Sequence, residues 1–221
     1  LRLRSNALQL SPQTGEPGAL PVSASGELRV HGHWQDWIVD GNARLKRAGK
    51  QATVTLAGRG DARHLSLQSF LAKTPGGSLR GNAELHWDPS MGASMAAELS
   101  SFDPGYFFPD YPGALSGKFD GNGERDAQGR WEGDARLADL RGTLRKRPVQ
   151  GQAVVHFIDG SGNGELSLRI GNSRIEAGGS YGEQLDLRAQ FSPLDLADLL
   201  AGAAGRLNGH GAMRGARSAP A

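Results

Sequence analysis

Apolar and polar residues alternate along most of the chain. The stretch Ala83–Trp87 reads AELHW, and Leu166–Ile170 reads LSLRI. Alternation over four to eight residues indicates a β-strand with one apolar and one polar face. Turn-forming clusters such as Pro75–Gly77 and Ser161–Gly164 separate these stretches. The pattern fits about a dozen strands, so we predict an all-β protein.

One segment departs from this alternation. Phe191–Gly202 reads FSPLDLADLLAG, with its leucines at helical spacing. Ser192 is a good N-cap, Pro193 then occupies the first helical position, and Asp195 can close a capping box. We therefore expect a short amphipathic helix or turn here, so that the fold contains one or two short helices or turns.

Two parts of the chain resemble each other. Ser100–Gly123 aligns without gaps with Ser192–Gly215, at a constant offset of 92 residues (205 against 113, for example). Upstream of each segment, the tripeptides LSL and GGS occur in the same order. Self-similarity of this kind favours a stacked, elongated architecture. We predict one elongated domain over residues 1–221, with internal repeat units at 65–123 and 166–215.

The composition narrows the class of protein. The chain has 221 residues, of which 38% are hydrophobic and 33 are glycine, so material for a thick core is scarce. Its net charge of +2 comes from interspersed residues, which predicts no nucleic-acid-binding face. Without cysteine there is neither a disulfide nor a thiolate metal site. Because the sequence begins with Leu1 in mid-pattern, we expect a fragment of a longer protein, whose membrane anchor lies outside it.

The candidate catalytic motifs fail on inspection. Gly113–Phe119 resembles a phosphate-binding loop only loosely, because three residues rather than four separate Gly113 from Gly117 and Phe119 follows Lys118. His31 and His33 share a strand face but have no evident third metal ligand. We find no nucleophile elbow and no recognisable pair of acid and base carboxylates. We therefore expect no enzyme activity, no cofactor and no metal.

The apolar stripe of the strands remains, and it has two interpretations. It could form the closed core of a sandwich, or it could be an apolar face open to a groove. Glycine-rich strands curve strongly, which favours a trough with an open face. The predicted groove-lining residues, which are candidates for lipid binding, are Leu28, Val30, Val54, Leu56, Leu65, Leu67, Leu85, Trp87, Met95, Leu99, Leu115, Phe119, Leu137, Val155, Phe157, Leu166, Leu168, Ile170, Leu185, Leu187 and Phe191.

Several blocks carry a family pattern. They are the proline- and glycine-rich block at Asp103–Gly123, the LRGTLRKRPVQG block within Leu137–Gly151, the segment Leu166–Gly182, and the leucine-rich run Asp195–Gly209. In this order and spacing they resemble the C-terminal β-rich region of the TamB family, within the AsmA-like superfamily. The resemblance covers the chain from about residue 65 onward.

The resemblance implies a β-taco, an elongated U-shaped sheet with an apolar concave groove. It also implies a periplasmic location, in a protein anchored in the inner membrane by an N-terminal segment not present here. The groove would shield phospholipid acyl chains during transport between membranes, or assist assembly and secretion by holding nascent outer-membrane β-strands. The partner implied is the outer-membrane barrel TamA.

Two other interpretations remain open at this stage. One is a structural or adhesive β-solenoid segment of a secreted passenger, in which the apolar stripe is closed into a core. The other is a carbohydrate-active β-helix enzyme, which would need clustered carboxylates and stacked aromatic residues, and the sequence lacks such a cluster. The first differs from the conduit in whether the apolar face is covered.

Overall fold

The fold is described from a computed structural model of the chain. The structure describes the backbone of residues 2–10, 22–199, 202–216 and 219–220. It describes the side chains of residues 23–198 and 202–216. The end of the predicted helical segment, Leu200 and Ala201, lies outside the described residues.

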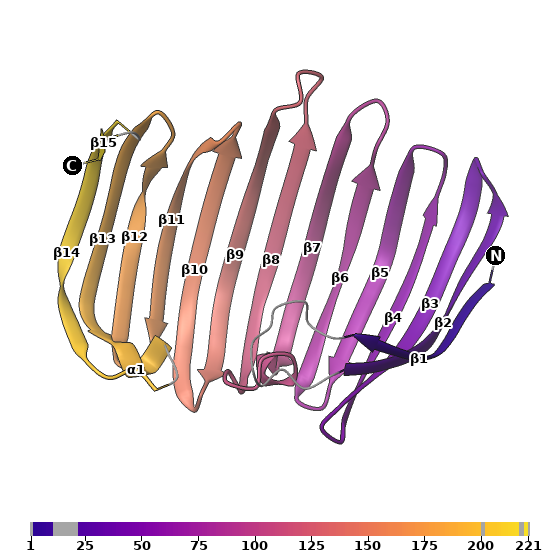
Figure 1. Cartoon of the computed structure of the whole chain (residues 1–221), viewed down its shortest axis with the longest axis horizontal. Coiled ribbons are helices and arrows are strands. Elements are labelled where there is room, and N and C mark those ends of the chain that lie inside the picture. Colours follow the sequence, from indigo (N-terminus) through magenta and orange to yellow (C-terminus); the bar gives the residue numbers. More distant parts are fainter. Residues whose placement is uncertain (1, 11–21, 200–201, 217–218, 221) are drawn as a thin grey trace.

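A single antiparallel sheet makes up almost all of the described chain (Figure 1). Its 15 strands follow one another in chain order, so each strand pairs with its neighbours in sequence. The prediction of an all-β fold is confirmed. The elements are β1 (Arg2–Leu10), β2 (Val22–His33), β3 (Asp36–Arg47), β4 (Lys50–Gly60), β5 (His64–Thr74), β6 (Gly77–His86), β7 (Met91–Phe102), η1 (Pro104–Tyr106), β8 (Gly113–Arg125), β9 (Trp131–Leu144), β10 (Arg147–Ile158), β11 (Ser161–Ile170), β12 (Ser173–Tyr181), β13 (Gln184–Asp195), α1 (Leu196–Leu199), β14 (Arg206–Ala216) and β15 (Ala219–Pro220).

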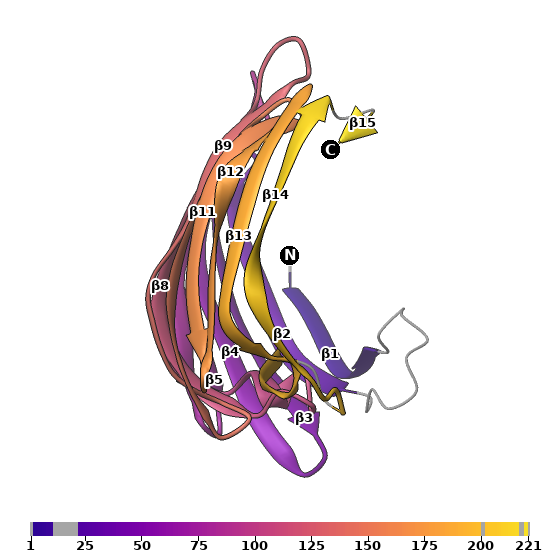
Figure 2. The same ribbon diagram turned by 90° about the vertical axis from the view of Figure 1, so that its left-hand side faces the viewer.

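The sheet is curved, and each strand bends along its length, as Figure 2 shows. Register shifts interrupt the ladders where the strands bend, for example between Leu67 and Phe70 on β5 and between Leu99 and Phe102 on β7. Such a bulge places an extra residue on one strand and bends it. Repeated bulges therefore turn a flat meander into the taco-like sheet expected from the sequence.

The two short helical segments identify the residues of the concave face. Both η1 and α1 lie on the concave side of the sheet (Figure 2). Asp198 of α1 accepts a hydrogen bond from Ser173 Oγ at 2.6 Å, and its other carboxylate oxygen lies 2.6 Å from Arg147 Nη1. Ser173 pairs with Ile170 in the ladder, so these residues share the concave face.

The helix near residue 195 begins later than predicted. Strand β13 continues to Asp195, because Leu194 and Asp195 stay paired with Leu207 and Arg206 of β14. Ser192 is therefore a strand residue, and its prediction as N-cap is wrong. The capping role falls to Asp195, whose Oδ1 accepts the backbone N–H of Ala197 at 3.0 Å.

The 3-10 turn η1 is capped in a similar way. Asp103 Oδ1 accepts the backbone N–H groups of Gly105 and Gly113, each at 2.9 Å. Tyr106 is only 2% exposed, and its hydroxyl donates to the carbonyl of Leu45 at 2.8 Å. The turn therefore reaches across the edge of the sheet to a strand far away in sequence.

An arginine holds each helical segment in place. Arg47, at the end of β3, donates to the carbonyls of Tyr106 and Phe107. Arg145, in the turn between β9 and β10, donates to the carbonyl of Ala197 at 3.2 Å. Because η1 follows β7 and α1 follows β13, each segment docks on the turn that begins four strands earlier. The two halves of the sheet thus use the same arrangement.

Few hydrophobic side chains are fully buried. Apart from Tyr106, those of the described residues lie on the concave face, and they are Val39, Ala52, Ala97, Val149, Ile170 and Leu194. No second sheet or long helix covers this face in the part of the chain that the structure describes. The fold is therefore a single layer.

The close approach of β8 to Gly142 of β9 allows the described strand register to be tested. Gly142 has φ of +141°, and a Cβ added to it would lie 1.9 Å from the carbonyl oxygen of Ala114. We expect Gly142→Ala to lower the free energy of unfolding by about 2 kcal/mol or more, measured by chemical denaturation. Gly211 has open space around its Cβ position, so Gly211→Ala should stay within about 0.5 kcal/mol of the unmodified protein. Equal effects would contradict the described register.

Candidate functional site

The pairing register shows which side chains share a face of the sheet. Residues directly opposite each other in an antiparallel pair project to the same side. Leu65 lies opposite Leu85 across β5 and β6, and Phe119 lies opposite Leu137 across β8 and β9. Following such pairs from strand to strand traces one continuous apolar face, which is the concave one.

All of the predicted groove-lining residues except Trp87, which lies outside the strand ladder, fall on this face. The register places there Leu28, Val30, Val54, Leu56, Leu65, Leu67, Leu85, Met95, Leu99, Leu115, Phe119, Leu137, Val155, Phe157, Leu166, Leu168, Ile170, Leu185, Leu187 and Phe191. Trp87 follows the last residue of β6, and its Nε1 donates to the carbonyl of Ala62 at 2.8 Å. A role of these residues in lipid binding stays a prediction.

Other apolar residues share the concave face but were not predicted. They include Trp37, Val39, Leu45, Phe70, Leu79, Leu140, Val149, Ile175 and Met213. Phe70 shows why they were missed. Strict alternation from Leu65 and Leu67 places residue 70 on the polar side, but the register shift between Leu67 and Phe70 returns it to the concave face. The two polar residues in succession before Phe70, Gln68 and Ser69, are the signal in the sequence.

Much of the concave face is open to solvent. Leu85 and Met95 are each 39% exposed, and Leu187 is 36% exposed. Further large exposed hydrophobic residues on this face are Met91, Trp131, Val155, Leu166, Tyr181, Leu207 and Met213. A contiguous apolar surface of this kind marks a site that binds another apolar surface or ligand.

Aromatic rings lie over glycines of neighbouring strands on the concave face. A Cβ added at Gly81 would lie 2.7 Å from Phe70 Cζ, and one added at Gly133 would lie 2.7 Å from Phe157 Cζ. The glycines therefore leave room for each ring to lie down across the adjacent strand. This packing gives the sheet an apolar floor with few projecting side chains, which explains part of the high glycine content.

The convex face is polar and carries cross-strand ion pairs. Arg80 Nη2 lies 2.6 Å from Glu98 Oε2, and Asp186 Oδ1 lies 3.2 Å from Arg214 Nε. Such charges project to the opposite side from their apolar neighbours along the strand. The two faces of the sheet thus have different chemistry, and only the concave face offers an extended apolar surface.

Among the described residues no group of three or more histidine or acidic side chains is arranged to hold a metal ion. The described helical segments are all far too short to cross a bilayer.

The fold and face define the class of protein. A single-layer, curved antiparallel sheet with an apolar inner face and a polar outer face is a β-taco-like structure. The family model described as TamB, N-terminal domain, matches residues 1–221. The chain therefore belongs to the TamB family, a transport and assembly component of the translocation and assembly module.

The family match refines the resemblance noted in the sequence. The matching model describes the N-terminal domain, so the expected placement in the C-terminal region is not confirmed. Comparisons with curated proteins and with solved structures find no match.

The ion pairs of the convex face predict a local pH effect. Arg80 donates two hydrogen bonds to Glu98, and together with the guanidinium charge they hold the pKa of Glu98 below its ordinary value. A carboxylate with a lowered pKa in the folded state stabilises the fold above its unfolded-state pKa, and this contribution is lost as the pH falls through the lowered pKa. In Arg80→Gln we expect a carbon NMR titration to show the pKa of Glu98 rising toward its ordinary value.

Arg59 supplies the control for this titration. It lies on the same face but pairs with Ser66 in the ladder. Arg59→Gln should leave the Glu98 titration unchanged. A Glu98 pKa that does not move in Arg80→Gln would contradict the described ion pair.

Proposed function

We propose that this chain is a segment of a hydrophobic conduit, in which the concave face shields phospholipid acyl chains from water. The observation that supports the proposal most directly is the continuous apolar face, which runs from strand to strand and is uncovered in the described structure. Transferring an acyl chain from water onto an apolar surface gains about 0.8 kcal/mol per buried methylene group. A chain of about 16 carbons would otherwise face a cost of roughly 12 kcal/mol in crossing water.

Uniform chemistry along the sheet suits movement of a ligand. The concave face repeats Leu, Val, Ala, Ile and Phe from strand to strand, so neighbouring positions offer similar binding energy. A lipid can then move along the sheet without a large barrier at each step. Fifteen strands at a spacing of about 4.8 Å extend over roughly 70 Å.

The open concave face argues against the alternative of a β-solenoid with a closed core. A structural or adhesive segment with a closed core would bury residues such as Met95 and Leu187, which are instead more than one third exposed. The exposure therefore favours a conduit. Nascent outer-membrane β-strands are a second possible cargo, because a strand with one apolar side could lie on the same surface.

Family membership supports the setting of this conduit. The TamB family works with the barrel TamA, and its members are anchored in the inner membrane. We infer that this chain is a periplasmic segment of such a protein and contributes to the path toward the outer membrane. The equivalent docking of η1 and α1 supports a single elongated domain built from two related units, near the proposed ranges 65–123 and 166–215.

Photo-crosslinking tests whether acyl chains occupy the concave face. We expect a crosslinking amino acid at Leu85, Met95 or Leu187 to capture phospholipid from vesicles. The same amino acid at the convex positions Arg80 or Ser94 should capture little, because those side chains face water. Lipid adducts are counted by mass spectrometry. Equal yields on both faces, or capture of unfolded outer-membrane protein alone, would overturn the lipid proposal.

A charge placed on the apolar path should block it. Leu166 and Ser167 are adjacent, exposed, and on opposite faces of β11. We expect Leu166→Arg to reduce lipid transfer between vesicles by about tenfold or more, because a passing acyl chain would have to desolvate the guanidinium. Ser167→Arg introduces the same charge on the convex face and should leave transfer unchanged. The idea of an apolar path fails if both variants transfer lipid at the unmodified rate.

A further inference from the structure

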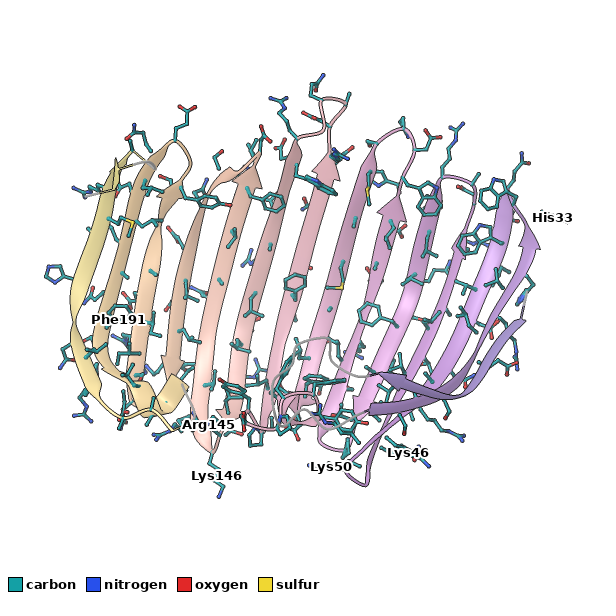
Figure 3. All side chains as sticks on the ribbon, viewed as in Figure 1. His33, Lys46, Lys50, Arg145, Lys146 and Phe191 are labelled. Atoms are coloured by element: carbon teal, nitrogen blue, oxygen red, sulfur yellow. The ribbon has the colours of Figure 1, made fainter. Side chains whose placement is uncertain are left out.

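The two long edges of the sheet differ in charge. In an antiparallel meander, alternate turns lie on the same edge. The edge that carries η1 and α1 also carries the turns after β3, β5 and β9 (Figure 1). We call it the basic rim, and its exposed or half-exposed cations include Lys46, Lys50, Lys73, Arg145 and Lys146. Figure 3 shows Lys46, Lys50, Arg145 and Lys146 along this edge, and His33 near the opposite one.

The opposite rim is predominantly acidic. Its turns and strand ends carry Asp36, Asp61, Asp88, Glu124, Asp126, Glu132, Asp159 and Glu183, against the cations Arg59, Arg63, Arg125 and Arg130. Arg63 is paired with Asp88, and Arg130 with Asp126. The charge of the chain is nearly balanced as a whole, but it is divided between the two edges of the sheet.

The carboxylates of the basic rim are mostly engaged. Asp103 and Asp195 accept backbone N–H groups at η1 and α1, and Asp198 pairs with Arg147. Asp110 is the remaining carboxylate of the loop after η1. Among the described residues, no ion pair joins Lys46, Lys50 or Lys146 to a carboxylate; the ion pairs that exist involve other cations. The lysine charges are therefore free to bind an anion.

Lys50 and Arg147 lie directly at the end of the apolar face, whereas Lys46 and Lys73 belong to the same rim but project to the convex side of their strands. Lys50 and Ala52 project to the same side of β4, and Ala52 is buried on the concave face. Arg147 and the buried Val149 have the same relation on β10. Two residues along a strand span about 6.6 Å. An acyl chain lying across the concave face would thus place its polar end beside Lys50 or Arg147, at the rim that also carries Lys46 and Lys146.

From this juxtaposition we propose that the basic rim binds the phosphate group of an anionic phospholipid whose acyl chains lie on the concave face. The proposal rests on the conduit function proposed above and adds the class and orientation of the lipid. The two basic turns, after β3 and after β9, are six strands apart, or roughly 29 Å at about 4.8 Å per strand. They form two equivalent headgroup positions, each beside a docked helical segment. The acidic rim repels the same headgroup, which fixes the orientation.

The test compares two lipids that share an acyl-chain photo-crosslinker. One has a phosphatidylglycerol headgroup and the other a phosphatidylcholine headgroup, each presented to the chain in vesicles at about 0.1 M salt, where the Debye length is about 10 Å. We expect the unmodified protein to crosslink the phosphatidylglycerol form preferentially. The triple variant Lys46→Gln, Lys50→Gln, Lys146→Gln should lose at least about fivefold of this preference, the effect of one lysine near an anionic lipid surface.

A matched control removes the same charge from the convex face. The variant Lys118→Gln, Arg136→Gln, Arg169→Gln changes exposed residues on that face. It should keep the full preference. Thermal unfolding of both variants checks that each one folds. A third variant, with arginine in place of Lys46, Lys50 and Lys146, keeps the charge and should retain the preference for phosphatidylglycerol.

The possible outcomes separate the two proposals. If both lipids crosslink equally in the unmodified protein, or if the rim and convex variants behave alike, the basic rim does not select headgroups, although the conduit proposal stands. If neither lipid crosslinks to the concave face, the conduit proposal itself fails. If soluble glycerol phosphate binds the lysines as tightly as the vesicle lipid does, measured by NMR shifts of the lysine side chains, the rim is a site for a soluble phosphate and the proposal is overturned.

Discussion

An apolar sheet face with no covering layer is the constraint on which the rest of this structure depends. Globular domains pack such a face against a second layer, but here the described chain provides none. Curvature supplies part of the missing contact, because bending the strands brings side chains of the concave face toward one another. Rings such as Phe70 and Phe157 also lie across glycines of the next strand. The remaining apolar surface stays in contact with solvent until another molecule covers it.

The helical segments show how a one-layer sheet can fix its edges. Arg47 is buried and donates to carbonyls 59 and 60 residues away, and the half-buried Arg145 donates to one carbonyl of α1, 52 residues away. Both arginines satisfy carbonyl groups that an isolated helical turn leaves unpaired. Lysines beside them in the same turns point to solvent. The same short turns therefore contain one cation that stabilises the fold and others that remain available for binding.

Period-two alternation was enough to predict an all-β fold and many of the apolar residues of the concave face. It fails where a bulge adds a residue, as at Phe70, because the two successive polar residues that mark the bulge, Gln68 and Ser69, shift the inward phase of every residue that follows. It also fails at Ser192, where the capping signals were correct in type but pairing with β14 kept the strand extended to Asp195. The docking of η1 on Arg47 could not be predicted, because it depends on curvature that brings distant turns together. The division of charge between the rims follows from the order of the turns and becomes visible only once that order is known.

The strict sequential order of the strands has a consequence for how such proteins evolve. Because each strand is bonded only to its chain neighbours, a hairpin can be inserted or deleted without disturbing any other pairing. Each hairpin would change the length of the sheet by roughly 10 Å at about 4.8 Å per strand. The length of the sheet can therefore be changed in small steps to match the width of the compartment that the protein spans.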